Sequence, residues 1–200
     1  MSEQGQHSAA SGDDALLVEA FQKGAGPKSA FSRLVVKYQD RIFNLCFRFM
    51  GSGEEADDCA QEVFLKVFRS LKDFRGESAF GTWLYRIAVN TCKNRLASRE
   101  HRDNRRTVSI DVPVQTEEGE VRMEIKDESL SPERALDAEE KNALIQEAIS
   151  ALPEDQRQVV VLRDIESLSY EEISRITGLN MGTVKSKLSR ARRALCEKLR

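Results

Sequence analysis

The amino-acid sequence predicts an all-α protein made of two small helical domains joined by a flexible acidic linker. Apolar residues recur every three or four positions through most of the chain, and no segment shows the alternation typical of a strand. Residues 92–106 hold six Lys or Arg against two acids, whereas residues 107–132 hold two against seven. Such a break in composition marks a domain boundary. We therefore expect domains over residues 15–106 and 132–200, with the linker over residues 107–131.

The N-terminal segment, residues 1–14, is polar and has neither the cationic start nor the apolar core of a secretory signal. We expect a disordered leader there. The longest apolar run, residues 42–50, is interrupted by Asn44 and Arg48 and falls short of the roughly 20 residues that a membrane-spanning helix needs. These features predict a cytoplasmic protein that is not itself embedded in a membrane.

The cysteines and histidines show no spacing typical of a metal site. Cys46, Cys59, Cys92 and Cys196 are scattered, and the histidines are His7 and His101. The first three cysteines fall on apolar helix faces, so we interpret them as small core residues and expect no metal and no cofactor. Neither histidine lies near a candidate nucleophile, and no glycine-rich phosphate loop is present, so the sequence does not predict an enzyme.

The first two predicted helices form the start of a bundle. Asp13 or Asp14 can cap a short helix that ends near Gly24. The next helix begins near Ser29 and ends before Gly51, and its broad apolar surface suits the centre of a bundle.

A third helix, predicted over residues 54–71, carries a polar and mainly acidic face opposite its apolar stripe. Ser52 and Glu55 stand at the spacing of a capping box at its start. The polar face comprises Asp57, Asp58, Gln61, Glu62 and Lys66. Acids in a first turn can simply complement the helix dipole. Because these acids extend beyond one turn, they also suit docking to a basic partner.

A fourth helix, predicted from about Ser78 to His101, combines aromatic and basic residues. Its inner face holds Phe80, Trp83 and Leu84, and a second face presents Arg86, Asn90, Lys93 and Asn94. Bases of single-stranded DNA stack on aromatic rings while their phosphates meet Lys and Arg, so the combination fits single-strand binding. A buried aromatic face with a solvated basic side would give the same pattern, and spacing alone leaves both open.

The C-terminal domain is predicted to start with a helix from Pro132, capped by Ser131, followed by a helix over residues 154–164 and a helix-turn-helix over residues 168–199. Ser169 and Glu172 stand at capping-box spacing, Gly178 permits a tight turn, and Asn180 can cap the last helix.

The last helix is basic around a narrow apolar seam. Residues 185–200 carry seven Lys or Arg and one acid. A helix of this kind suits the major groove of DNA, where its cations neutralise phosphates. A solvated surface helix is the plain alternative, and the turn and caps favour nucleic-acid binding.

Two segments together resemble the bacterial sigma-70 family of transcription initiation factors, specifically its extracytoplasmic function (ECF) group. Residues 54–96, EEADDCAQEVFLKVFRSLKDFRGESAFGTWLYRIAVNTCKNRL, resemble sigma region 2. Residues 152–195, LPEDQRQVVVLRDIESLSYEEISRITGLNMGTVKSKLSRARRAL, resemble sigma region 4. The paired, ordered motifs are more specific than a helix-turn-helix alone.

The resemblance implies three sets of contact residues. The set for docking on the clamp helices of the largest polymerase subunit is Asp57, Asp58, Gln61, Glu62 and Phe64. The set for the −10 promoter element, including capture of an unstacked base, is Phe74, Arg75, Trp83, Arg86, Asn90, Lys93, Asn94 and Arg95. The set for the −35 element is Thr183, Lys185, Ser186, Ser189, Arg190, Arg192 and Arg193.

The function implied is that of an ECF-type sigma factor that binds core RNA polymerase, recognises the −35 and −10 elements and promotes promoter melting. Its implied partners are core polymerase, through the clamp helices and the flap region, promoter DNA, and an anti-sigma factor. The alternative is a stand-alone helix-turn-helix regulator of duplex DNA, which would leave the acidic face at residues 57–62 unexplained.

Overall fold

The computed structural model describes residues 4–24, 26–106 and 132–200, and within these ranges every regular element is a helix, as the sequence predicts. The predicted linker, residues 107–131, lies outside the described residues. The elements are α1 (Gln4–Gln22), α2 (Pro27–Met50), α3 (Gly53–Ser70), η1 (Leu71–Asp73), α4 (Phe80–Arg106), α5 (Pro132–Ser150), α6 (Glu154–Val160), η2 (Val161–Ile165), α7 (Tyr170–Thr177) and α8 (Met181–Lys198).

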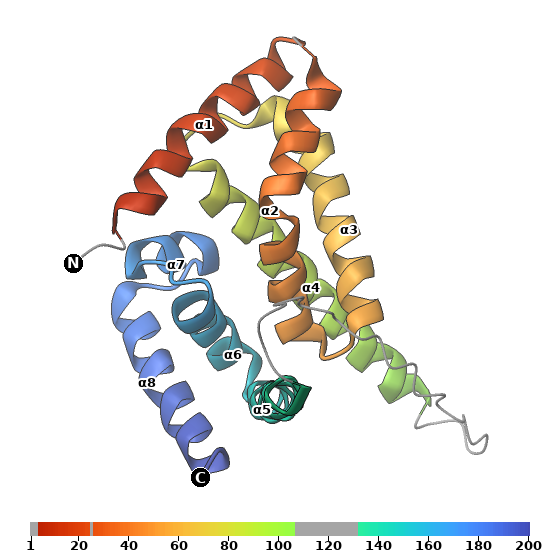
Figure 1. Ribbon diagram of the computed structural model, residues 1–200, viewed down its shortest axis with the longest axis vertical. Helices are drawn as coiled ribbons and strands as arrows, with labels where there is room; N and C mark the ends of the chain where they lie inside the picture. Colours follow the sequence, from red (N-terminus) through yellow and green to blue (C-terminus); the bar gives the residue numbers. More distant parts are fainter. Residues whose placement is uncertain (1–3, 25, 107–131) are drawn as a thin grey trace.

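Helices α1 to α4 form the N-terminal half, residues 4–106, with α2 at its centre (Figure 1). The turn between α2 and α3 follows from two residues. Gly51 adopts a positive φ of 79° and its N–H bonds to the carbonyl of Phe47, which closes the last turn of α2. The hydroxyl of Ser52 accepts from the N–H of Glu55, which caps α3. This is one half of the predicted capping box; the Glu55 carboxylate instead accepts from Arg99 at 2.8 Å. The two helices thereby turn back on each other and share an apolar core.

The first helix begins earlier than predicted. It is helical from Gln4, so residues 4–14 of the predicted leader lie within α1, and neither Asp13 nor Asp14 caps it. Asp14 is instead buried against α2, where it accepts a hydrogen bond of 2.6 Å from the Tyr38 hydroxyl and pairs with Lys37. Burial and the bond to Asp14 raise the pKa of Tyr38. The sequence could not reveal that this aspartate faces inward, because the partners lie on another helix.

Helices α5 to α8 form the C-terminal half, residues 132–200, and its helix-turn-helix has the predicted caps. The Ser169 hydroxyl accepts from the N–H of Glu172 at 3.2 Å, and the Glu172 carboxylate accepts from the N–H of Ser169 at 2.8 Å. Gly178 ends α7 with a φ of 73°, which suits glycine. Asn180 caps α8 by accepting from the N–H of Thr183 at 2.8 Å. The helix predicted over residues 154–164 is divided into α6 and the π-helical η2.

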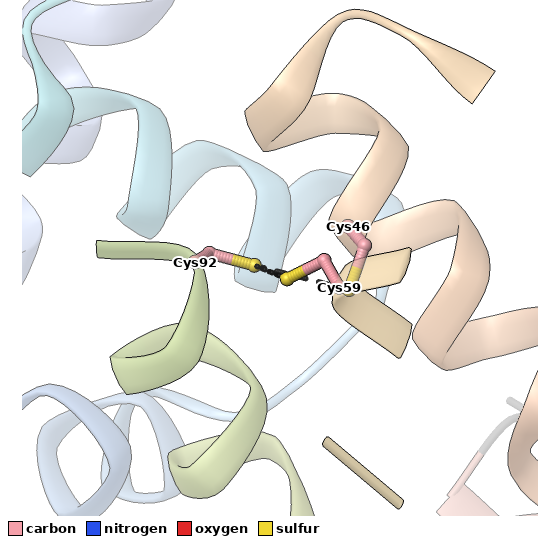
Figure 2. A group of neighbouring side chains, drawn as sticks. All are labelled: Cys46, Cys59 and Cys92. Atoms are coloured by element: carbon pink, nitrogen blue, oxygen red, sulfur yellow. Dashed lines mark hydrogen bonds between the residues drawn. The ribbon is translucent and has the colours of Figure 1, made fainter. Parts of the chain in front are cut away.

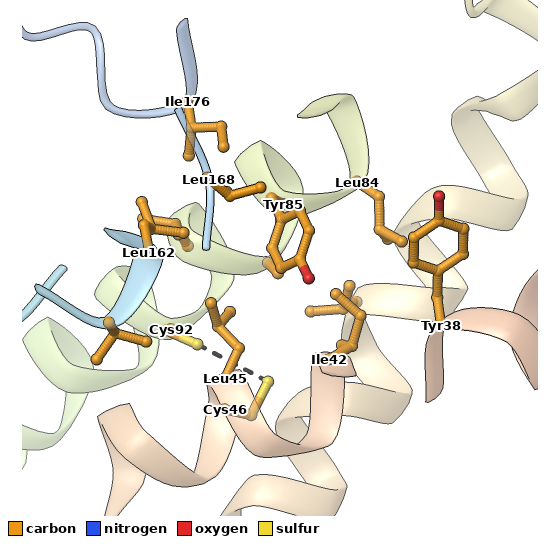
Figure 3. Packing of buried hydrophobic residues seen from close by; sticks show 14 of the residues in the cluster. Tyr38, Ile42, Leu45, Cys46, Leu84, Tyr85, Cys92, Leu162, Leu168 and Ile176 are labelled. Carbon is orange, nitrogen blue, oxygen red and sulfur yellow. Dashed lines mark hydrogen bonds between the residues drawn. The ribbon is translucent and has the colours of Figure 1, made fainter. Parts of the chain in front are cut away.

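The two halves pack on each other through one hydrophobic core (Figure 3). Tyr85 and Leu45 of the N-terminal half lie beside Leu162, Leu168 and Ile176 of the C-terminal half. Since each of these side chains is at most 6% exposed, the contact excludes water.

Polar contacts join the same two surfaces. The Tyr85 hydroxyl donates to the Glu166 carboxylate at 2.5 Å. The Arg157 guanidinium donates to the Phe49 carbonyl at 3.1 Å, and the Gln146 amide donates to the Phe47 carbonyl at the same distance. The sequence predicts two domains but gives no sign of this shared surface.

Candidate nucleic-acid interface

A cavity of about 550 Å³ opens beside the connection between α3 and α4. The predicted −10 residues Phe74, Arg75, Trp83 and Arg86 all line it, together with Asp73, Glu77, Ser78, Thr82 and Arg175. Its walls therefore combine aromatic rings with charges of both signs. Arg175 comes from α7 of the other half, and no sequence pattern predicts its place here because its approach depends on how the halves pack.

Aromatic packing and one glutamine hold the cavity wall in place. The Phe74 and Trp83 rings lie 4.9 Å apart between centroids, and Phe80 lies 6.0 Å from Trp83. The Gln22 side-chain amide of α1 donates to the carbonyls of Phe74, at 2.8 Å, and Leu71, at 3.1 Å. Sequence reasoning missed Gln22, since a glutamine at a helix end has no pattern that distinguishes it.

The other predicted −10 residues lie further along α4 and do not line this cavity. Asn90 and Asn94 are exposed. Lys93 pairs with Glu154 of the C-terminal half at 3.5 Å. Arg95 points back to α3, where its Nε donates to Glu62 at 2.8 Å and its guanidinium lies 4.0 Å from the Asp58 carboxylate. The eight residues thus form two groups with different surroundings.

The acidic face of α3 is in part neutralised by basic residues of its own half. Glu62 pairs with Lys66 at 2.7 Å and with Arg95, and the hydrogen bonds from Lys66 and Arg95 lower the pKa of Glu62. Asp57 is exposed and accepts a hydrogen bond of 2.8 Å from Gln61. Phe64, the fifth predicted docking residue, is half-buried and packs against the core. The most open carboxylates on this face are therefore those of Asp57 and Asp58.

Helix α8 buries Val184, Leu188 and Ala191 and exposes most of its predicted DNA contacts, namely Lys185, Ser186, Ser189, Arg190, Arg192 and Arg193. Thr183 is half-buried at the N-terminal cap.

Two of these cations of α8 have partners within the chain. Arg192 binds the Asp164 carboxylate through two nitrogens, with Nε at 3.0 Å, and the Lys185 ammonium lies 5.6 Å from the centre of the Tyr170 ring. Among the described residues, Arg190 and Arg193 have no ion-pair partner. Of the predicted −35 contacts, they are the cations most available to phosphates.

Three cysteines that are scattered in the sequence meet inside the N-terminal half (Figure 2). The Sγ atoms of Cys59 and Cys92 lie 3.7 Å apart, and those of Cys92 and Cys46 lie 3.9 Å apart. Hydrogen bonding with Cys46 and Cys92, together with the charge of Arg95, lowers the pKa of the Cys59 thiol. The interpretation of these residues as small core side chains is confirmed by their burial, but their spacing in the sequence did not predict that the three sulfur atoms meet. One feature of the sequence could have indicated this meeting: each cysteine lies on the apolar face of a different one of three successive helices.

In the part of the chain that the structure describes, no helix is both long enough and apolar enough to cross a membrane.

Comparisons with known proteins identify both halves of the chain. The family description "Sigma-70 region 2" matches residues 34–102, and "Sigma-70, region 4" matches residues 142–195. The RNA polymerase sigma-H factor of Pseudomonas aeruginosa is 46% identical over 183 residues, 91% of either chain. The ECF RNA polymerase sigma-E factor of Escherichia coli K12 is 43% identical over 187 residues, 93% of this chain and 94% of the relative.

Two solved structures share the fold at 22% identity. CnrH, in complex with the cytosolic domain of CnrY, superposes with a TM-score of 0.65 over 94% of this chain and 97% of that one. The sigma factor RpoE of Bartonella quintana, in complex with the anti-sigma factor NepR, superposes with a TM-score of 0.64 over 84% of this chain and 96% of that one. From the two matched regions and the relatives that span nearly the whole sequence, the chain belongs to the sigma-70 family of RNA polymerase sigma factors, in its ECF group.

Proposed function

We propose that this ECF sigma factor binds core RNA polymerase, recognises the −35 and −10 promoter elements with its two halves, and promotes promoter melting. The observation that supports the proposal is the presence of two exposed surfaces of different chemistry. One is a basic helix exposed along one side, and the other is a cavity lined by aromatic rings and by charges of both signs, with three arginines against two acids. Duplex DNA suits the first surface, and an unstacked base suits the second.

The cavity beside Trp83 is the proposed site for a base of the −10 element. Phe74 and Trp83 offer ring faces for stacking, and Arg75 and Arg86 stand at its edge for phosphate contact. Asn90 and Asn94, exposed further along α4, would follow the same strand. Arg95 and Lys93, which are paired within the chain, would join only after exchanging their carboxylate partners for phosphates.

Helix α8 is the proposed reader of the −35 element. Its N-terminal turns hold Thr183, Lys185 and Ser186, which would face base edges, while Ser189, Arg190, Arg192 and Arg193 would face the backbone. Support comes from the caps of α7 and α8, which set where the first helix of the motif ends and the second begins.

The exposed acids of α3 are the proposed docking surface for the clamp helices of core polymerase, with Gln61 and Glu62 beside Asp57 and Asp58 and half-buried Phe64 on the same helix. The C-terminal half would meet the flap region. We propose no catalytic activity for the chain, since polymerase supplies the chemistry, and we assign its action to the cytoplasm. A regulating anti-sigma factor is proposed as a further partner because the solved structure of Bartonella quintana RpoE, which shares this fold, holds one.

The test is run-off transcription from a promoter library with purified core polymerase and the full chain. We expect transcripts from a defined set of promoters only when both proteins are present. Tight, sequence-specific binding to closed duplex without polymerase, and no specific transcript with it, would instead support the stand-alone regulator.

A further inference from the structure

We propose that Cys46, Cys59 and Cys92 form a binding site for one soft, thiophilic metal ion held by three thiolates. The three residues come from α2, α3 and α4, and their sulfur atoms point toward one another in the core (Figure 2). Neither promoter recognition nor polymerase docking uses these side chains, so the site is additional to the proposed function.

The separations between the sulfur atoms match those found around a metal ion. Metal–sulfur bonds of about 2.3 Å at tetrahedral or trigonal angles place neighbouring sulfurs about 3.8–4.0 Å apart. The observed distances are 3.7 Å between Cys59 and Cys92 and 3.9 Å between Cys92 and Cys46, and all three sulfurs lie within 4.8 Å of one another. A disulfide would need about 2.0 Å, so the three cysteines are free thiols, and their spacing lets them become ligands of one ion without a large shift of the sulfur atoms.

The surroundings favour a three-coordinate ion. All three cysteines are 0% exposed, which leaves the cluster without contact to solvent. In the described residues the cluster includes no histidine or carboxylate that could serve as a fourth ligand. Structural zinc sites almost always use four ligands, whereas thiolates also select Cu(I). The set therefore favours Cu(I) over zinc.

An ion at this place would join the three helices that carry the proposed −10 cavity and docking face. Cys59 lies on α3 next to Asp58, and Cys92 lies on α4 six residues beyond Arg86. Occupancy would thus hold the two functional surfaces in one fixed arrangement.

The decisive experiment measures binding of Cu(I) to the full chain, purified anaerobically in the reduced state, by competition with a chromophoric Cu(I) chelator. We expect one Cu(I) per chain. Replacing any one of the three cysteines by alanine should weaken binding by at least about 10-fold. The matched control is Cys196→Ala, because Cys196 is the exposed free cysteine on α8 and should leave binding unchanged. Circular dichroism establishes that each variant is folded.

X-ray absorption of the Cu(I)-loaded wild-type chain gives a result that does not depend on any variant. Three sulfurs at about 2.3 Å are expected. The site is overturned if Cu(I) affinity is unchanged in each of the three single alanine variants. It is also overturned if the Cu(I) ion is coordinated by nitrogen and oxygen in place of sulfur. Zinc bound in preference to Cu(I), with the same dependence on the three cysteines, overturns the assignment to a three-coordinate ion.

Discussion

Trp83 contributes the largest ring to the cavity, and its neighbours hold it in one orientation. Phe74 and Phe80 pack against it, and the Gln22 amide fixes the backbone at Phe74. Such a ring can stack on an unpaired base without rearrangement, which reduces the entropy lost on binding. The position is therefore the best single test of the proposed −10 site.

Trp83→Ala should impair promoter opening while leaving duplex binding at the −35 element unchanged. Base stacking on an aromatic ring contributes about 1–3 kcal/mol, so we expect roughly a 5- to 150-fold loss in open complex. Permanganate reactivity of the −10 thymines measures it. Trp83→Phe keeps a ring and serves as the control. An equal loss of opening and of duplex binding would contradict the assignment.

Charge reversal on the acidic face of α3 distinguishes a residue that only contacts polymerase from one that also stabilises the fold. Asp57→Lys should weaken association with core polymerase with little change in Tm, since Asp57 is exposed and, among the described residues, its side chain bonds to Gln61 alone. Glu62→Lys should weaken association and also lower Tm, because it places a cation against Arg95; the lost surface pair contributes up to about 1 kcal/mol.

Association is measured by fluorescence anisotropy with labelled sigma factor, and Tm by thermal melting. Asp40→Lys, on an exposed position of α2, is the matched control. If Asp57→Lys and Asp40→Lys bind polymerase equally well, the docking face lies elsewhere.

The helix-turn-helix illustrates how far local sequence specifies an element. The first N–H groups of any α-helix have no partner within the helix, and the reciprocal bonds of Ser169 and Glu172 satisfy two such amides. In α7, which has only eight residues, these amides are a large share of the backbone. Ser169→Ala should therefore destabilise the chain by about 1 kcal/mol in urea unfolding. Ser169→Asp retains an N-cap acceptor and should recover most of the loss. Equal stability of the alanine variant would show that the cap is not needed.

On α8, whether a cation already has a partner within the chain determines how much its replacement should weaken DNA binding. Arg190 has no ion-pair partner in the described part of the chain, so Arg190→Ala should lower affinity for −35 duplex and make the salt dependence shallower by about one unit. The measurement is anisotropy over a range of salt concentrations. Lys28→Ala, exposed on α2, should leave the slope unchanged. If the salt dependence of Arg190→Ala equals that of the unmodified chain, Arg190 does not contact a phosphate.

Sequence reasoning succeeded where a feature depends on residues a few positions apart. The capping residues Ser52, Ser169 and Asn180 and the turn at Gly178 all depend on such local contacts. It failed where partners come from distant segments, as with the burial of Asp14. The pairing of Arg95 with Glu62, the approach of Arg175 and the meeting of the three cysteines likewise depend on packing between helices. The π-helical turn at residues 161–165 has no sequence signal that we used.

At the scale of the whole molecule, Glu166 makes the contact between the halves sensitive to pH. Burial raises the pKa of Glu166 above its usual 4.5, although the Tyr85 hydroxyl and the charge of Arg41 oppose the shift. The stability contributed by the protonated carboxyl is complete below pH 4.5 and is lost as pH rises through the raised pKa. At neutral pH the half-buried, ionised carboxylate therefore weakens the packing between the two halves.

Glu166→Gln should raise Tm at neutral pH, because the amide can still accept from Tyr85 and brings no charge into the half-buried contact. The gain should shrink as pH falls toward 4.5, where the native carboxyl is also neutral. Thermal melting across this range measures it, with exposed Glu147→Gln as the control. A lower Tm of Glu166→Gln at neutral pH would mean that the hydrogen bond from Tyr85 to the ionised carboxylate stabilises the fold by more than the desolvation of that carboxylate costs.

The core shared by the two halves should hold them together even after the polypeptide between them is cleaved. A protease that cleaves between residues 107 and 131 would leave two polypeptides still joined by Tyr85, Leu45 and the side chains packed on them. The fragments should co-purify and recombine when expressed separately, as in fragment complementation. The two fragments would then form a split reporter, and the Kd of their association would measure the affinity of one half for the other.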